Sequence, residues 1–360
     1  MSLQERGSTI MSKYVIDGLF LTQRMTGTQR YSFELTNELD KLVSKGELEI
    51  LVPLSAESIP EFKNITVVRY GKRNGIAWQQ TDLAWYLRKN KKQGIFFNNV
   101  LPLLYPYGII TVHDVCYKAN PRFYSSMRDK LSMLWHRLHY FFAAHSKMLI
   151  LTVSEFSKSE IIRYYKVDAD RIKVIKNGWQ HMNNIIAAEN TFEKYNFLKP
   201  DNYYFSMSSL GANKNFKWIL HAAKNNPDSV FAIAGGGKLK GAAEAGEFVD
   251  LPNIHFLGYV SDEDAKTLMA NCKAFLFPTL YEGFGIPPLE AVSCGCSRII
   301  ISDTPCMHEI YGEFADYLNP DKTDMNLEDM QSENTSDIKQ ILNKYSWYKS
   351  ACELVELLRK

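Results

Sequence analysis

The sequence predicts an α/β protein of two Rossmann-like, doubly wound domains that face a cleft. Short runs of branched and aromatic residues alternate with longer stretches of helical period, which is typical of a parallel sheet with crossover helices. This alternation occurs in two successive series, with a polar stretch of no sustained period at 179–202 between them. At 360 residues, the chain has roughly twice the length of an ordinary domain. We therefore expect one domain over 11–190 and a second over 200–345.

The first series begins with a strand at 14–20, a glycine turn and a helix from Thr28 with one apolar face. Its remaining strands are expected at 48–54, 65–70, 94–98, 108–114, 148–154 and 171–178, with helices at 78–91, 124–145 and 155–166. The second series predicts strands at 202–209, 229–237, 253–258, 273–279, 297–302 and 315–319. Ser261 and Asp264 form a start resembling a capping box for one of its helices.

Composition excludes several classes of protein. Hydrophobic residues make up 46% and charged residues 23%, so the chain is globular rather than disordered. Lysine and arginine number 42 against 40 acidic residues, an excess too small for a protein whose main task is nucleic acid binding. The six cysteines form no paired C-x-x-C sets, which favours reduced thiols over a zinc site. No apolar stretch is long enough to span a membrane, and residues 1–10 lack the apolar core of a signal peptide. We expect a cytoplasmic protein whose first ten residues lie outside the fold.

The most informative segment is 277–296. A buried strand ends near Pro278, and a helix begins at Pro287, since proline is favourable in a first helical turn. Glu282 lies in the loop between them and Glu290 in the first helical turn. Both carboxylates therefore flank the carboxyl end of a parallel strand, where open α/β sheets bind ligands.

The same loop offers an anion site. Phe284, Gly285 and Ile286 present backbone amides at a helix N-terminus, and glycine allows close approach of a phosphate. Carboxylates repel phosphate but accept hydrogen bonds from hydroxyls, so a ligand with both groups, a nucleotide sugar, fits. The plainer alternative is that Glu290 complements the helix dipole and Glu282 is a solvated loop residue.

Glu282 and Glu290, which bracket G-F-G-I-P-P-L, resemble the paired-glutamate signature of the retaining nucleotide-sugar glycosyltransferases of family four (group 1), enzymes of the GT-B type. The resemblance extends in order along most of the chain, through TVHDV, TVSEFSKSEI, KVIKNG, IAGGG and LGYVSDEDA. The last segment, 346–360, is similar to the family helix that crosses back to the first domain. The resemblance makes the first domain the acceptor side and the second the donor side.

The resemblance also implies a role for each matching residue. Glu290 would hold the ribose hydroxyls of the donor, Glu282 the hydroxyls of its sugar, and the amides of 284–286 its diphosphate or sugar. Lys214 would neutralise the departing diphosphate, although alone it is an ordinary solvated lysine. Gly27 would face the phosphates and His113 the donor sugar; alone, the first is a turn glycine and the second a structural histidine. Many relatives carry an arginine where this chain has Ser208, so leaving-group charge would rest on Lys214, the amides and the helix dipole.

The implied reaction is hexose transfer with retention, with His113, Glu282 and Lys214 catalytic and no metal or cofactor. Two other motifs give weak signals. Asp168 and Asp170 form a D-x-D, which holds a metal in other sugar transferases, but they precede a strand on the wrong side of the sheet. The glycines at 235–237 lack the G-x-G-x-x-G spacing of an NAD site.

The acceptor is left open between a glycan and a lipid-linked molecule. The helix at 124–145 carries basic and aromatic residues that could contact a membrane, which would place the protein at its inner face. Its apolar residues Met127, Leu131, Leu134, Leu138 and Phe142 follow helical spacing, so core packing is the stronger explanation. The donor base and sugar are also open. Two alternative functions remain: a bilobed sugar- or nucleotide-binding protein, and a GT-B nucleotide-sugar epimerase. The resemblance favours surface polysaccharide assembly.

Overall fold

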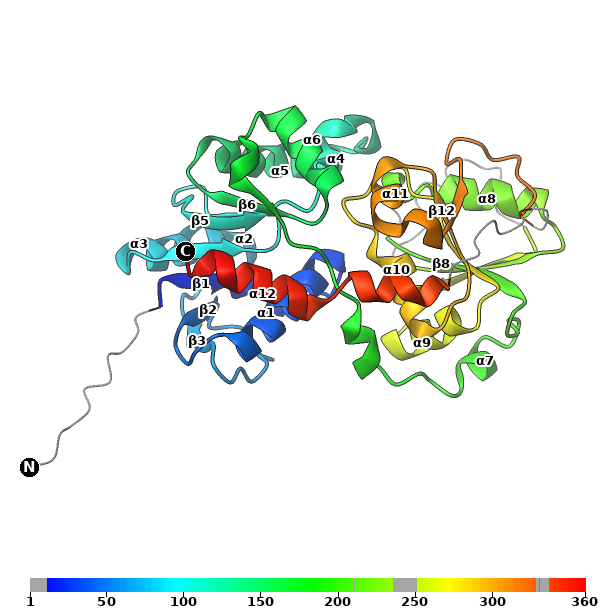
Figure 1. Ribbon diagram of the computed structural model, residues 1–360, viewed down its shortest axis with the longest axis horizontal. Coiled ribbons are helices and arrows are strands. Elements are labelled where there is room, and N and C mark those ends of the chain that lie inside the picture. The colour runs from blue at the N-terminus through cyan, green and yellow to red at the C-terminus, as the bar shows by residue number, and fades with distance from the viewer. Residues whose placement is uncertain (1–11, 210, 236–250, 328–329, 331–336) are drawn as a thin grey trace, which may run out of the picture.

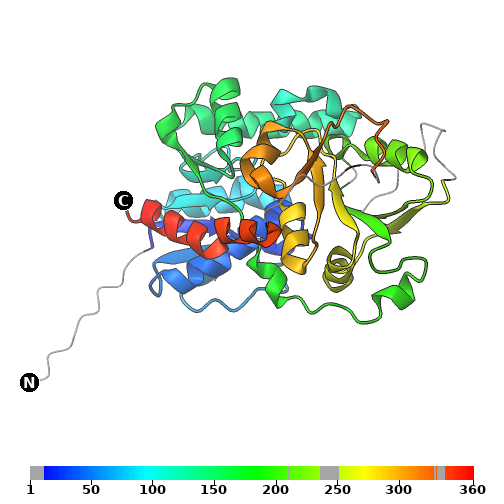
Figure 2. The ribbon, with the colours of Figure 1, turned by 45° about the vertical axis from the view of Figure 1, so that its right-hand side comes forward.

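Two parallel sheets form the framework of the protein, one in each lobe (Figures 1 and 2). The computed structural model describes residues 12–209, 211–235, 251–327, 330 and 337–360. Each predicted strand corresponds to an observed one, usually shorter by a residue or two at its ends. The expected fold class of two doubly wound α/β domains is therefore confirmed.

The first sheet has seven strands in the order β3-β2-β1-β4-β5-β6-β7, all parallel. This is the doubly wound order: β2 and β3 are added on one side of β1, and β4 to β7 are added on the other side. Its strands are β1 (Tyr14–Asp17), β2 (Leu48–Val52), β3 (Thr66–Arg69), β4 (Gln93–Phe96), β5 (Gly108–Thr111), β6 (Leu149–Thr152) and β7 (Ile172–Val174). Its helices are α1 (Gly27–Leu42), α2 (Gly75–Trp78), α3 (Ala84–Lys89), α4 (Cys116–Ala119), α5 (Met127–His145) and α6 (Glu155–Tyr165).

The second sheet has six parallel strands in the order β10-β9-β8-β11-β12-β13 and repeats this topology. Its strands are β8 (Tyr203–Met207), β9 (Val230–Ala234), β10 (Ile254–Gly258), β11 (Ala274–Phe277), β12 (Ile299–Ser302) and β13 (Asp316–Leu318). The helices of this half are α7 (Thr191–Lys194), α8 (Phe216–Asn225), α9 (Asp262–Ala270), α10 (Ile286–Cys294) and α11 (Pro305–Tyr311), and α12 (Trp347–Leu358) ends the chain.

One continuous apolar core joins the two lobes. Alternate residues of the first sheet pack against α1 on one face, and this cluster continues through Tyr345 and Trp347 to α9, α10 and α11 of the second lobe. Helix α12 returns to the first lobe and lies along α1 (Figure 1). Helices α5 and α6 cover the opposite face of the first sheet, and α8 covers the other face of the second.

The apolar stripe of α5 is exposed, so the prediction that it packs in the core is wrong. Met127, Leu131 and Leu134 are 73%, 61% and 64% exposed, and Leu138 and Phe142 are more than a third exposed. The face that α5 buries carries His139, Tyr140, Ala143 and Ala144 instead. Helical spacing identifies an apolar stripe, but it does not identify what covers that stripe.

Other sequence features fall away from the cleft or outside the described residues. Asp168 and Asp170 lie just before the amino end of β7. His113 lies at the opposite edge of the same sheet, where it follows the carboxyl end of β5. Residues 1–10 and glycines 236 and 237 lie outside the described residues. Among the helices that the structure describes, none is long and apolar enough to cross a membrane.

Candidate active site

The loop between β11 and α10 pairs the predicted carboxylate with the predicted lysine. The Nζ atom of Lys214 lies 2.5 Å from Oε1 of Glu282, and the Thr279 hydroxyl donates to the same oxygen at 2.7 Å. Both charged side chains are mostly buried, at 19% and 12% exposed. Lys214 lies between β8 and α8. This segment is held against the loop between β11 and α10, because the backbone N–H of Leu280 donates to the Asn213 carbonyl at 2.7 Å. A cation and a carboxylate therefore stand side by side at the carboxyl end of the second sheet.

Gly285 shapes the start of α10. Its φ of +78° is in the left-handed region that favours glycine, and a Cβ there would meet Met307 at 2.6 Å. The Tyr311 hydroxyl donates to the Gly285 carbonyl and accepts from the Leu289 N–H. Phe284 is buried and packs edge-on against Tyr345, with ring centroids 5.2 Å apart. The side chain of Phe284 is thus occupied in packing, and only its backbone is suited to contact a ligand.

Glu290 is the fifth residue of α10 and lies just past its first turn, so its expected place in that turn is wrong, because the helix begins at Ile286. A histidine from the segment that joins the lobes contacts it. His181 Nε2 is 2.9 Å from Glu290 Oε1. The Trp347 indole N–H donates to His181 Nδ1 at 3.1 Å. Because Nδ1 accepts a hydrogen bond, Nε2 must carry the proton that it donates to the carboxylate. This chain of contacts links α10, the connection between the lobes and α12.

His113 follows β5 and is held as a neutral imidazole. Its Nε2 lies 2.8 Å from the Phe97 carbonyl, to which only an N–H can donate. Burial lowers the pKa of His113 to about 4, although the bond to Phe97 opposes this shift. The ring packs edge-on against Tyr31, with centroids 4.8 Å apart. At neutral pH this side chain therefore offers Nδ1 as an acceptor and carries no charge.

The glutamate loop touches the first lobe directly behind His113. A Cβ on Gly283 would lie 2.1 Å from the His113 carbonyl oxygen, so only glycine permits this contact. Ser154 Oγ donates to the Gly283 carbonyl at 2.6 Å, and Ser157 Oγ donates to the His113 carbonyl at 3.0 Å. These contacts hold the loop that carries Glu282 against the segment that carries His113.

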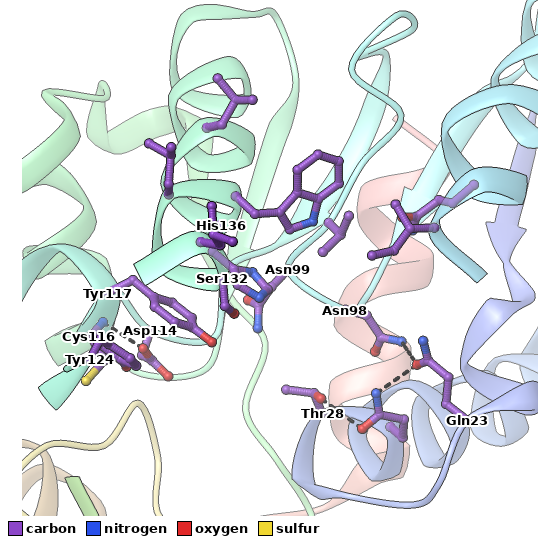
Figure 3. A pocket seen from close by; sticks show the side chains of 18 of the residues that line it. Gln23, Thr28, Asn98, Asn99, Asp114, Cys116, Tyr117, Tyr124, Ser132 and His136 are labelled. Carbon is purple, nitrogen blue, oxygen red and sulfur yellow. Dashed lines mark hydrogen bonds between the residues drawn. The ribbon is translucent and has the colours of Figure 1, made fainter. Parts of the chain in front are cut away.

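A cavity of about 920 Å³ opens in the first lobe beside this site (Figure 3). It does not include Lys214, Glu282 or Glu290, and its one residue from the second lobe is Asn213. Asp114 connects the two regions, since it lines the cavity and also interacts electrostatically with Glu282 and Lys214. Burial raises the pKa of Asp114, and the Glu282 carboxylate raises it further, while a hydrogen bond from the Cys116 N–H opposes both.

The lining of the cavity combines polar and apolar side chains. In Figure 3, Gln23, Thr28 and Asn98 gather on one side, and Asp114, Tyr117 and Tyr124 lie across from them. The apolar part of the wall comes from Ile76, Val100, Leu131, Leu134, Trp135 and Leu138. The site as a whole thus combines a charged region between the lobes with an amphiphilic cavity.

Three further positions that the sequence singles out are Gly27, Ser208 and Ile286. Gly27 is the first residue of α1, and a Cβ there would meet nothing within 4 Å. Its neighbours Thr28 and Gln29, rather than Gly27, line the cavity. Ser208 follows β8, and its hydroxyl donates to the Ser209 carbonyl. Ile286 is the first residue of α10, where its amide is free of the intrahelical ladder.

Sequence reasoning missed His181 and gave Asp114 no role. His181 lies in a polar stretch without a motif, so nothing in the sequence pairs it with a residue 109 positions away. Asp114 directly follows His113 in TVHDV, and this position beside a predicted site residue could have identified it. Within the described parts of the chain, no three His, Cys, Asp or Glu side chains cluster in a way that could hold a metal ion.

Comparison with known proteins agrees with this architecture. The family described as Glycosyltransferase Family 4 matches residues 25–180, and the one described as Glycosyl transferases group 1 matches residues 187–329. O-antigen chain mannosyltransferase B of Escherichia coli is 27% identical over 340 residues, which are 83% of this chain and 84% of that protein. O-antigen chain mannosyltransferase RfbU of Salmonella typhimurium is 30% identical over 236 residues, 64% of this chain and 62% of that protein.

The fold also matches a solved structure. The structure of Anabaena HepE in complex with UDP-glucose has a TM-score of 0.69 and 16% identity, over 97% of this chain and 99% of that one. At this identity the likeness concerns the fold alone. The two family matches cover both lobes in the order in which the sequence motifs occur. The chain is therefore a glycosyltransferase with the GT-B fold, whose first lobe matches the Glycosyltransferase Family 4 model and whose second lobe matches the Glycosyl transferases group 1 model.

Proposed function

We propose that this glycosyltransferase moves a hexose, with retention and without a metal, from a nucleotide-diphosphate sugar to a hydroxyl of a glycan or lipid-linked acceptor. The observation that carries the proposal is the contact of Lys214 with Glu282 beside the amides that begin α10. A site that binds both phosphate and sugar hydroxyls requires a cation, free amides and a carboxylate together. The O-antigen mannosyltransferase names of relatives support a setting in surface polysaccharide assembly and make a mannosyl donor the first to test.

The donor would lie along the second lobe. Glu290 accepts hydrogen bonds from the ribose hydroxyls, and Glu282 accepts them from the sugar. Lys214 then exchanges part of its contact with Glu282 for the diphosphate, whose charge grows as it leaves. The amides of 284–286 and the helix dipole add to this stabilisation. In this chain they would act with Ser208 at the position where the family resemblance implies an arginine.

The acceptor would enter from the cavity of the first lobe, where Asp114 orients its hydroxyl. The new bond to the anomeric carbon forms on the face from which the diphosphate departs, so the anomeric configuration is retained. As this bond forms, the bond from the anomeric carbon to the diphosphate breaks, and the proton of the acceptor hydroxyl passes to the departing diphosphate. His113 is neutral at physiological pH, because burial lowers its pKa to about 4. It serves as a hydrogen-bond acceptor for the donor sugar rather than as an acid. The protein contributes position and electrostatics, which are the dominant effects for a phosphate leaving group.

We propose a location for this reaction and no need for a cofactor. Nucleotide sugars are made in the cytoplasm, so we place the enzyme there, with its acceptor presented at the inner membrane face. No cofactor is needed, because the energy of transfer is supplied by the donor's own phosphate ester. The group 1 family matches favour transfer over a binding protein without chemistry. They favour it over an epimerase as well.

The proposal is tested by the release of nucleoside diphosphate from a panel of GDP-, UDP- and ADP-sugars, with nucleotide binding followed by thermal unfolding. Glu282→Ala should abolish transfer and leave nucleotide binding nearly intact, whereas Glu290→Ala should weaken nucleotide binding itself. Glu356→Ala is the matched control, because Glu356 is an exposed side chain on α12. Full activity in both site variants would overturn the assignment.

A further inference from the structure

The outer face of α5 is apolar, and no described side chain covers it. Met127, Leu131, Leu134 and Leu138 recur every three or four residues and continue at Phe141, which is half exposed. The buried residues Tyr140 and Ala143 lie about half a turn away, on the opposite side of the helix. A helix of a soluble protein normally turns its apolar stripe to the core. This stripe therefore needs a partner other than the protein's own core.

The charge around this stripe is strongly positive. Residues 116–147 contain six lysines and arginines and a single acid, Asp129, so the segment has an excess of five positive charges. The whole chain has an excess of only two, so the rest of it is negative by three. Arg128, Lys130 and Lys147 are exposed beside the apolar residues. The partner of this face is thus both apolar and anionic.

The stripe also adjoins the proposed acceptor cavity. Leu131, Leu134 and Leu138 line the cavity and at the same time belong to the exposed stripe. The lining also includes polar residues, Asp114 among them. A molecule with a hydroxylated head at Asp114 and an apolar tail toward α5 would leave the cavity along this face.

We propose that the outer face of α5 docks on an anionic phospholipid bilayer, from which an amphiphilic, lipid-linked acceptor enters the cavity. This inference rests on the proposed function, which identifies the cavity as the acceptor site. A second copy of the chain is a poorer occupant, because a two-fold contact through this face would bring its own positive charges together. An apolar stripe with basic flanks on a 19-residue helix fits the plane of a bilayer interface instead.

The test is sedimentation of the full chain with vesicles of phosphatidylcholine alone and of phosphatidylcholine mixed with phosphatidylglycerol. Binding should require the anionic lipid and weaken with salt. Met127→Glu combined with Phe141→Glu changes two stripe residues that do not line the cavity, and it should lower binding by at least about tenfold. Ile186→Glu is the control, because Ile186 is 83% exposed on the segment that joins the lobes.

Each outcome bears on the inference separately from the proposed function. Equal binding to both kinds of vesicle, or undiminished binding by the double variant, would overturn it. So would a concentration-dependent dimer that the double variant abolishes, since a second copy would then cover the face. Thermal unfolding of the double variant with and without nucleotide confirms that it is folded. If the wild-type protein transfers sugar but does not bind vesicles, only this inference is wrong. If it binds anionic vesicles but transfers no sugar, only the proposed function is wrong.

Discussion

His181 donates from Nε2 to the Glu290 carboxylate across 2.9 Å, and its other nitrogen accepts from Trp347. One imidazole thus connects the proposed ribose-binding carboxylate to α12, the helix that returns to the first lobe. The segment that carries His181 runs between the two lobes. The orientation of Glu290 is therefore set by the same residues that join the lobes.

We predict that the two amide substitutions of His181 differ in donor binding. Glutamine can place its amide nitrogen near the position of Nε2 and keep the bond to Glu290. Asparagine reaches only the position of Nδ1, and loss of one such hydrogen bond to a charged group should raise the donor KM roughly tenfold or more. The rate at saturating donor should change little. Equal donor KM values for His181→Gln and His181→Asn would show that the contact is structural only.

Asp114→Asn should reduce acceptor-dependent transfer and leave donor binding unchanged. The asparagine oxygen can still accept from the Cys116 N–H, so the loop keeps its shape. What is lost is the charge that strengthens a hydrogen bond to an acceptor hydroxyl, which predicts a fall in kcat/KM for acceptor of about 10- to 100-fold. Asp168→Asn, at the opposite edge of the sheet, is the control. An effect of Asp168→Asn alone would favour the D-x-D motif over Asp114.

Gly27→Ala separates a ligand role from a turn role. The added Cβ meets no atom within 4 Å, and Gly27 does not have a positive φ. The free energy of unfolding should therefore stay the same or rise by about 0.4–1 kcal/mol. If the first turn of α1 faces the diphosphate, the methyl group should weaken donor binding, as measured by calorimetry. Unchanged donor affinity would leave Gly27 with no role in the site.

The stability of the protein should depend on pH through Asp17, which is buried at the end of β1. Burial raises its pKa from 3.8 to about 6, although hydrogen bonds from Gln79 and the Leu19 N–H oppose the shift. Since the folded state binds this proton more tightly, the contribution of Asp17 is complete below about pH 4. It is lost as the pH rises through 6, at a cost of about 3 kcal/mol.

Asp17→Asn removes this loss, so the variant should gain stability relative to the wild type between about pH 4 and pH 7. Urea unfolding of both proteins across that range measures the gain. His113 acts in the opposite direction, because its pKa is lowered to about 4 and the protein gains stability as the pH rises. The contribution of His113 is the same in both proteins, so it cancels in the difference between their free energies of unfolding. A difference that does not vary with pH would contradict the prediction.

The sheets and the glutamate loop could be predicted from sequence because their signals are local. A buried strand such as β11 is a run of apolar residues, and the start of α10 is marked by Pro287 and Pro288. The doubly wound order then brings the strand ends to the cleft, which explains why Lys214 and Glu282 meet. The contact of Lys214 with Glu282 itself is a matter of side-chain geometry that no spacing reveals.

The remaining features depend on contacts between distant segments. His181 meets Glu290 and Trp347 only after both lobes and α12 have packed. The face of α5 that enters the core was predicted wrongly, because its aromatic and small residues gave a weaker pattern than the exposed leucines. A periodic apolar stripe indicates that a surface will be covered, and the partner can be another molecule.

Hexose transfer with retention is proposed at the site of Lys214 and Glu282. The most direct measurement is the anomeric configuration of the product, determined by NMR after incubation with a nucleotide sugar and an acceptor. With retention, the product should have the anomeric configuration of the donor, and Glu282→Ala should give no product. A product of inverted configuration, or full transfer by Glu282→Ala, would contradict it.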